Sequence, residues 1–168
     1  MTAPEFSRPV DRRHLPAGRV TLVASAEECA ALTARFGLVS IGALEAEVRL
    51  TPDGEAIEAA GRLRAAIVQS CAISGEDLPA AIDEPLALRF VPPAPVTAEE
   101  LELDASALDE ISFEGHAFDL GEAVAQSLAL AIDPFAVGPD AERVRKEAGL
   151  LDEAAAGPFA ALAALKKG

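Results

Sequence analysis

Three long segments of alternating apolar and polar residues, separated by turn sequences, constrain the fold of this chain most. They span residues 41–50, 55–70 and 78–91 of the 168-residue sequence. Turn sequences stand between them, Thr51-Pro52-Asp53-Gly54 after the first and Ser74-Gly75-Glu76-Asp77 after the second. A period of two is typical of strands that bury one face, and tight turns join antiparallel neighbours. The three segments therefore predict an antiparallel β meander.

Shorter patterns before and after these segments add strands and a helix. Residues 19–24 alternate and predict a short strand, and residues 111–118 are expected to add another. Ser25 and Glu28 have the spacing of a capping box, so we expect a helix to begin there. Gly37 can adopt the left-handed conformation that ends this helix.

The clearest helix is predicted over residues 119–132. Apolar side chains recur there every three or four positions, and Asp119 with Glu122 forms a variant of the capping box. Two more short helices are expected, one over 140–149 and one from residue 157 onward.

These elements together predict an α+β fold, in which an antiparallel meander of about four or more strands packs with two to four helices. The pattern leaves open whether the sheet curls into a barrel. We expect a single domain over residues 1–168, with a basic N-terminal arm over 1–18 and an acidic loop over 92–117.

Negative charge is concentrated in one part of the chain. The sequence has 14 basic and 28 acidic residues, a net charge of −14, and residues 76–122 hold 13 of the acidic residues but only one basic residue. This excess argues against tight autonomous binding of RNA or DNA and against an anionic membrane surface. The absence of Trp and Tyr also removes most platforms for base stacking.

The uneven charge defines two candidate contact regions. The locally basic N-terminal region is expected to touch RNA phosphates weakly, through Arg8, Arg12, Arg13 and Arg19. The acidic region is expected to dock a basic protein, because opposite charges steer the encounter. Its candidate residues are Glu99, Glu100, Glu102, Asp104, Asp109 and Glu110.

A search for catalytic and cofactor motifs finds no site. Glycine-rich phosphate loops and hydrolase motifs are missing, and His14 and His116 are expected to be ordinary surface residues. Cys29 and Cys71 are expected to be structural, reduced thiols of a cytoplasmic protein. We therefore expect no enzyme activity, cofactor or metal. Two alternatives stay open: an α+β domain whose carboxylates hold a metal or ligand, and a generic acidic interaction module.

Several segments, in their order along the chain, carry a resemblance to a known family. They are residues 4–10 (PEFSRPV), 61–71 (GRLRAAIVQSC), 78–92 (LPAAIDEPLALRFVP), 118–134 (FDLGEAVAQSLALAIDP) and 158–166 (PFAALAALK). This order resembles the YceD family, domain of unknown function 177, also called the large ribosomal RNA subunit accumulation proteins. The opening segment looks like the alphaproteobacterial branch, and the resemblance covers nearly the whole chain.

The resemblance implies a non-enzymatic role in the accumulation of 23S ribosomal RNA and in large-subunit assembly, among ribosomal precursor components. It favours a basic ribosomal protein as partner, because family genes often neighbour the gene of a small basic zinc-ribbon ribosomal protein. Many relatives have Cys-x-x-Cys at the turn after the long strand, whereas this chain has Cys71 and Ser74, and no cysteine over 134–168. A zinc site of that kind is therefore expected to be absent here.

Overall fold

The computed structural model of the chain describes residues 4–93 and 109–149. These residues form two compact units. The first comprises residues 4–68, 79–93 and 109–132, and the second comprises residues 69–78 and 133–149.

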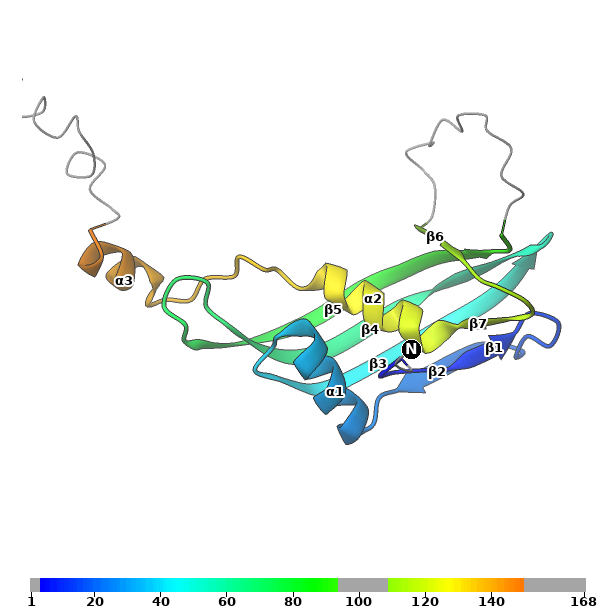
Figure 1. Cartoon of the computed structure of the whole chain (residues 1–168), viewed down its shortest axis with the longest axis horizontal. Coiled ribbons are helices and arrows are strands. Elements are labelled where there is room, and N and C mark those ends of the chain that lie inside the picture. Colours follow the sequence, from blue (N-terminus) through cyan, green and yellow to red (C-terminus); the bar gives the residue numbers. More distant parts are fainter. Residues whose placement is uncertain (1–3, 94–108, 150–168) are drawn as a thin grey trace, which may run out of the picture. The chain divides into compact units, whose positions relative to one another are not determined.

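A five-stranded sheet is the framework of the first unit (Figure 1). The strands follow one another across the sheet in the order β2 (Arg19–Val23), β3 (Ser40–Asp53), β4 (Ala56–Ser70), β5 (Asp77–Val91) and β6 (Asp109–Ser112). β2 and β4 both pair antiparallel with β3, whereas β6 lies parallel to β5. The predicted α+β fold is confirmed, with one parallel strand added to the meander. Within the described residues the sheet stays open, with β2 and β6 at its edges.

The region 111–118, expected to add one short strand, contains parts of two. β6 ends at Ser112, and β7 (Ala117–Asp119) pairs with β1 (Pro9–Asp11) in a small antiparallel sheet. The chain changes from one sheet to the other through a turn in which Gly115 has a φ of 75°, a conformation that favours glycine.

One face of the five-stranded sheet encloses the core together with two helices. Alternate residues of β3, β4 and β5 are buried against α1 (Ala26–Phe36) and α2 (Leu120–Ala131), which both cover this face in Figure 1. The largest fully buried side chains are Phe6, Phe90, Leu32, Leu44, Leu63, Leu120, Leu128, Val48 and Val124. The intervening residues point to the opposite face, where most side chains of the described strands are exposed.

Both helices begin where the sequence indicates. Ser25 and Glu28 form the reciprocal capping box of α1, as predicted. Asp119 caps α2 by accepting a hydrogen bond from the Glu122 N–H at 3.0 Å. The Glu122 carboxylate binds the Arg35 guanidinium of α1 at 2.7 Å. The side chain expected to complete a second capping box therefore joins the two helices.

The second unit joins the turn after β4 to the segment that follows α2. The Ala72 N–H donates to the Ala136 carbonyl oxygen at 2.9 Å, and the Gln69 side-chain amide donates to the Asp133 carbonyl oxygen at 2.7 Å. The helix predicted over 140–149 is confirmed as α3 (Ala141–Glu147). The helix predicted from residue 157 onward lies outside the described residues.

Candidate functional site

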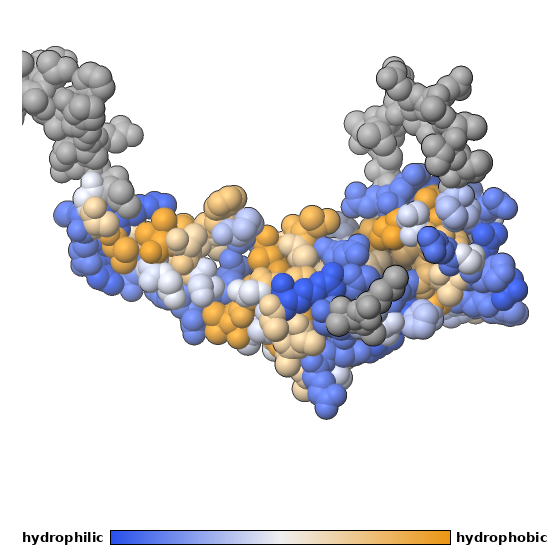
Figure 2. Space-filling model, viewed as in Figure 1, coloured by the Kyte–Doolittle hydropathy of each residue, from blue (hydrophilic) through white to orange (hydrophobic). Residues whose placement is uncertain are grey.

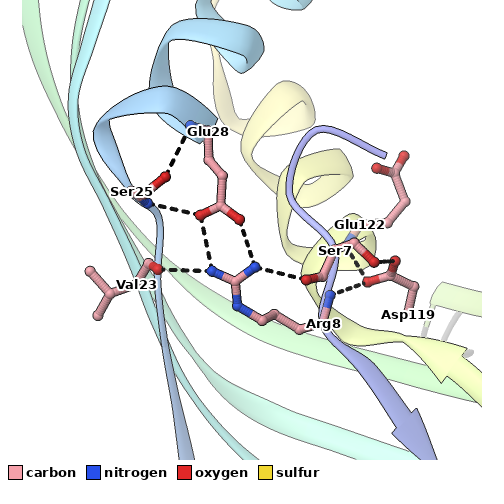
Figure 3. Close-up of polar contacts among 7 residues, drawn as sticks. All are labelled: Ser7, Arg8, Val23, Ser25, Glu28, Asp119 and Glu122. Atoms are coloured by element: carbon pink, nitrogen blue, oxygen red, sulfur yellow. Dashed lines mark hydrogen bonds and ion pairs between the residues drawn. The ribbon is translucent and has the colours of Figure 1, made fainter. Parts of the chain in front are cut away.

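The N-terminal segment, predicted to be a basic arm, is packed into the first unit. Phe6 is fully buried, and Ser7 and Arg8 lie against the start of α2 (Figure 3). The Asp119 carboxylate accepts hydrogen bonds from the Ser7 hydroxyl at 2.5 Å and from the Arg8 main-chain N–H at 2.8 Å. Gly121 permits this close approach, because a Cβ atom there would lie 2.6 Å from the Phe6 carbonyl oxygen.

Arg8 forms an ion pair within this unit. Its guanidinium donates to both carboxylate oxygens of Glu28, at 2.7 and 2.9 Å, and to the Val23 carbonyl oxygen at 3.2 Å (Figure 3). Hydrogen bonding from Arg8 lowers the pKa of Glu28 from its usual value of 4.5 to about 2. A bidentate pair of this kind leaves few free donors for a phosphate.

The other three predicted RNA contacts lie at separate places. Arg13 donates to Asp11 at 3.3 Å in the turn after β1, and the Arg12 guanidinium lies 6.0 Å from the centre of the Phe113 ring. Arg19 lies on β2, at the edge of the sheet. RNA contact by any of the four arginines stays a prediction.

Arg19 lies together with three arginines that the sequence analysis did not single out. It stands directly opposite Arg49 of β3, while Arg62 and Arg64 of β4 stand opposite two glutamates of β3. All four side chains lie on the exposed face of the sheet, around a depression of about 450 Å³. We call Arg19, Arg49, Arg62 and Arg64 the arginine cluster.

Carboxylates on the same face pair with three members of the arginine cluster. The pairs are Arg19–Glu47 at 3.3 Å, Arg64–Glu45 at 3.6 Å and Arg62–Asp83. The hydrogen bond between Arg62 and Asp83 raises the pKa of the arginine and lowers that of the aspartate. The paired side chains are between 49% and 68% exposed, so each pair contributes little to stability.

Two of the six predicted docking residues lie in the described structure. Asp109 and Glu110 begin β6, and the other four lie outside the described residues. Asp109 lines an open groove of about 490 Å³ beside β5 and the C-terminal half of α2. Glu84 adds a second carboxylate to this groove, and Leu130 adds an apolar side chain that is 82% exposed. Figure 2 shows hydrophobic surface over this part of α2.

The turn after β4 contains Cys71 and Ser74. The Cys71 thiol accepts hydrogen bonds from the N–H groups of Ser74 and Gly138, both at 3.3 Å. Hydrogen bonding from the Ser74 side chain and main chain, and from Gly138, favours the thiolate and lowers the pKa of Cys71 to about 6. Cys29 is buried in α1, and burial raises its pKa. Both cysteines are free and buried.

The remaining titratable side chains do not gather into a metal centre. Within residues 4–93 and 109–149, no group of three or more His, Cys, Asp or Glu side chains is placed to hold a metal ion. His14 is exposed beside Asp11, at 3.6 Å, and His116 lies in the turn before β7. In the same part of the chain, no helix has both the length and the apolar character that a membrane span requires.

Comparison with known protein families identifies the family of this chain. The sequence model described as large ribosomal RNA subunit accumulation protein YceD matches residues 59–166. The chain belongs to the YceD family. The YceD match begins within β4, so Arg62 and Arg64 lie inside it, whereas Arg19 and Arg49 precede it. The family description concerns accumulation of the large ribosomal RNA and names no enzyme class. No curated protein and no solved structure matches the chain.

Proposed function

We propose that this YceD protein promotes the accumulation of 23S ribosomal RNA as a non-enzymatic factor in large-subunit assembly. It acts by holding a basic ribosomal protein on its acidic side and by touching precursor RNA. Membership of the YceD family supports the ribosomal role. The concentration of acidic residues in 76–122 supports the basic partner.

The observation that carries the proposal is the groove beside β5 and α2. Two exposed carboxylates, Glu84 and Asp109, lie in its lining together with the exposed Leu130. A ribosomal-protein segment with one apolar side chain between lysines or arginines matches this combination. Asp109 also begins β6, directly after the segment that carries most of the predicted docking residues.

The ribosomal role is tested in cells. Deletion of the gene is expected to lower the amount of mature 23S ribosomal RNA and of large subunits relative to small subunits, measured by RNA gels and by sedimentation. A plasmid copy of the wild-type chain should restore both. Normal amounts of 23S ribosomal RNA in the deletion strain would overturn the ribosomal role.

The docking surface is tested with purified proteins. Each basic protein of the large subunit is presented to the immobilised chain after nuclease treatment, at low and at moderate salt. For a protein that binds, Glu84→Gln with Asp109→Asn should weaken binding by roughly tenfold at low salt and by less at moderate salt. The control, Glu27→Gln with Glu55→Gln, removes two exposed carboxylates elsewhere on the first unit. An equal loss in both double variants would overturn the groove as the docking surface.

A further inference from the structure

We propose that the exposed face of the sheet carries a binding site for the backbone phosphates of RNA, formed by the arginine cluster. This inference rests on the proposed function, since it names where that function's precursor RNA is held. It replaces a basic N-terminal arm with a site on three neighbouring strands.

The sheet itself brings the four guanidinium groups together. Arg19 and Arg49 face each other across β2 and β3, and residues in such positions have Cβ atoms about 5 Å apart. Arg62 lies one strand further on, and Arg64 lies on the same face two positions along. The depression that they line also contains Ala60, whose small side chain leaves room above the strand. Long side chains from three strands can therefore converge on one stretch of RNA backbone.

The pairing of Arg19 with Arg49 is unfavourable for folding. Like charges directly opposite each other on neighbouring strands destabilise a sheet. The charge of Arg19 is offset by the ion pair with Glu47, but Arg49 forms no ion pair with any other described residue. Neither side chain fills the core, because both lie on the exposed face. A negatively charged ligand accounts for an arrangement that folding alone disfavours.

The three ion pairs of the cluster do not block such a ligand. Their arginines and carboxylates are about half exposed or more, and exposed pairs of this kind contribute little to stability. A guanidinium can therefore exchange a carboxylate for a phosphate, which it binds with the same two-pronged geometry. The acidic residues elsewhere in the chain are screened beyond roughly 8 Å at physiological salt.

The lining of the depression also indicates which part of the RNA is recognised. It consists of the arginine cluster with Glu47, Ala60 and Gly61, and it contains no aromatic side chain. Bases therefore have no aromatic platform on which to stack. The expected contact is with phosphates, so affinity should depend strongly on salt and little on sequence.

The test measures binding of a labelled hairpin of large-subunit ribosomal RNA to the purified chain, by fluorescence anisotropy at several salt concentrations. Arg49→Gln with Arg62→Gln is expected to weaken binding by roughly 100-fold, about tenfold for each lost charged contact. The slope of log affinity against log salt should fall by about 2. A hairpin of equal length and unrelated sequence should bind within a few-fold of the first.

The matched control removes the same charge from exposed residues of α3 that do not line the depression, with Arg143→Gln and Lys146→Gln. It should change affinity by no more than about three-fold, because charges that do not belong to the site add only screened attraction. Equal weakening in the two double variants would show that binding depends only on the net charge of the chain, and this would overturn the site. Circular dichroism and thermal unfolding check that every variant is folded.

A variant with the opposite effect separates binding from a structural role. Glu47→Gln removes the carboxylate that competes for Arg19, so it should strengthen RNA binding. Arg49→Gln alone should weaken binding while leaving the midpoint of thermal unfolding unchanged or higher, because the like-charge pair is removed. Weaker RNA binding by Glu47→Gln, or clear destabilisation by Arg49→Gln, would contradict the proposal.

The site and the proposed function fail in different ways. Wild-type chain that binds no RNA, together with loss of 23S ribosomal RNA in the deletion strain, would overturn the site and leave the ribosomal role and the protein contact standing. Loss of RNA binding in the cluster variant, together with normal 23S ribosomal RNA in the deletion strain, would support the site and overturn the function.

Discussion

Gly61 sets how closely two long strands approach each other. A Cβ atom at this position would collide with the Glu47 carbonyl oxygen and would lie 2.8 Å from the Val48 Cα atom. Only glycine fits without a shift of the backbone. We predict that Gly61→Ala lowers the free energy of unfolding by about 1–3 kcal/mol, measured by denaturant unfolding. Gly42→Ala is the control, since its Cβ would lie an ordinary 3.7 Å from the Ala66 carbonyl oxygen. Equal losses in the two variants would contradict this account.

The ion pair between Glu28 and Arg8 makes the stability of the fold depend on pH. The pKa of Glu28 is about 2 in the folded chain, below the usual 4.5, because Arg8 donates two hydrogen bonds to its carboxylate. The stability that this ion pair contributes is therefore complete above about pH 4.5 and is lost as the pH falls towards 2.

We predict that Glu28→Gln unfolds more easily at pH 7 and loses less additional stability between pH 5 and pH 2.5 than the wild type. Denaturant unfolding at a series of pH values measures both effects. Glu55→Gln, at an exposed turn position, is the control and should follow the wild-type profile. Parallel profiles for wild type and Glu28→Gln would rule out this coupling.

At the scale of elements, one carboxylate joins the N-terminal segment to α2. Asp119 caps the helix and also accepts from Ser7 and Arg8. We predict that Asp119→Ala lowers the free energy of unfolding by about 2–3 kcal/mol, because the loss of a helix cap adds to a polar group left without its partner.

Limited proteolysis checks the second part of this prediction. Cleavage near Arg8 should become faster in Asp119→Ala, since the segment loses its anchor. Asp140→Ala, at the start of α3, is the control, because no side-chain hydrogen bond caps that helix. A similar cleavage rate near Arg8 in the wild type and in Asp119→Ala would show that Phe6 alone holds the segment.

Strands and helices that depend on neighbouring residues are predicted well from the sequence. The three alternating segments became β3, β4 and β5, and Ser25 with Glu28 marked the start of α1, because periodicity and capping depend on neighbours in the chain. The pairing of β6 with β5 and of β7 with β1 depends on residues far apart in sequence, which no local pattern reports.

The arginine cluster was not predicted from the sequence because it too depends on long-range pairing. Arg49 and Arg62 become neighbours of Arg19 only through the register of β2, β3 and β4. A pairing shifted by one residue would move each of them to the other face. Conversely, Arg8 reads as part of a basic arm. The burial of Phe6, the hydrogen bonds to Asp119 and the pairing of β1 with β7 show that the segment belongs to the fold. The sequence indicated this only through Phe6, an apolar residue before a run of charged residues.

At the scale of the whole molecule, the two units differ in how much they bury. Among the described residues of the second unit, the buried apolar side chains are Cys71 and Ala141, whereas the core of the first unit contains the buried leucines and phenylalanines. We predict that amide hydrogens of residues 72–76 and of α3 exchange at least about 100-fold faster than those of β3 and β4. Hydrogen exchange followed by mass spectrometry measures this difference. Equal protection of both regions would show that the units open together.

The hydrogen bond between Ser7 and Asp119 joins residues 112 positions apart, and this sets the timing of folding during synthesis. At roughly 5–20 residues per second, several seconds pass between the translation of these two residues. Throughout that interval β1 lacks its partner strand β7. The newborn chain therefore cannot close this part of its fold until Asp119 has been made. Any slowing of elongation lengthens the period in which chaperones and proteases can reach the segment around Ser7.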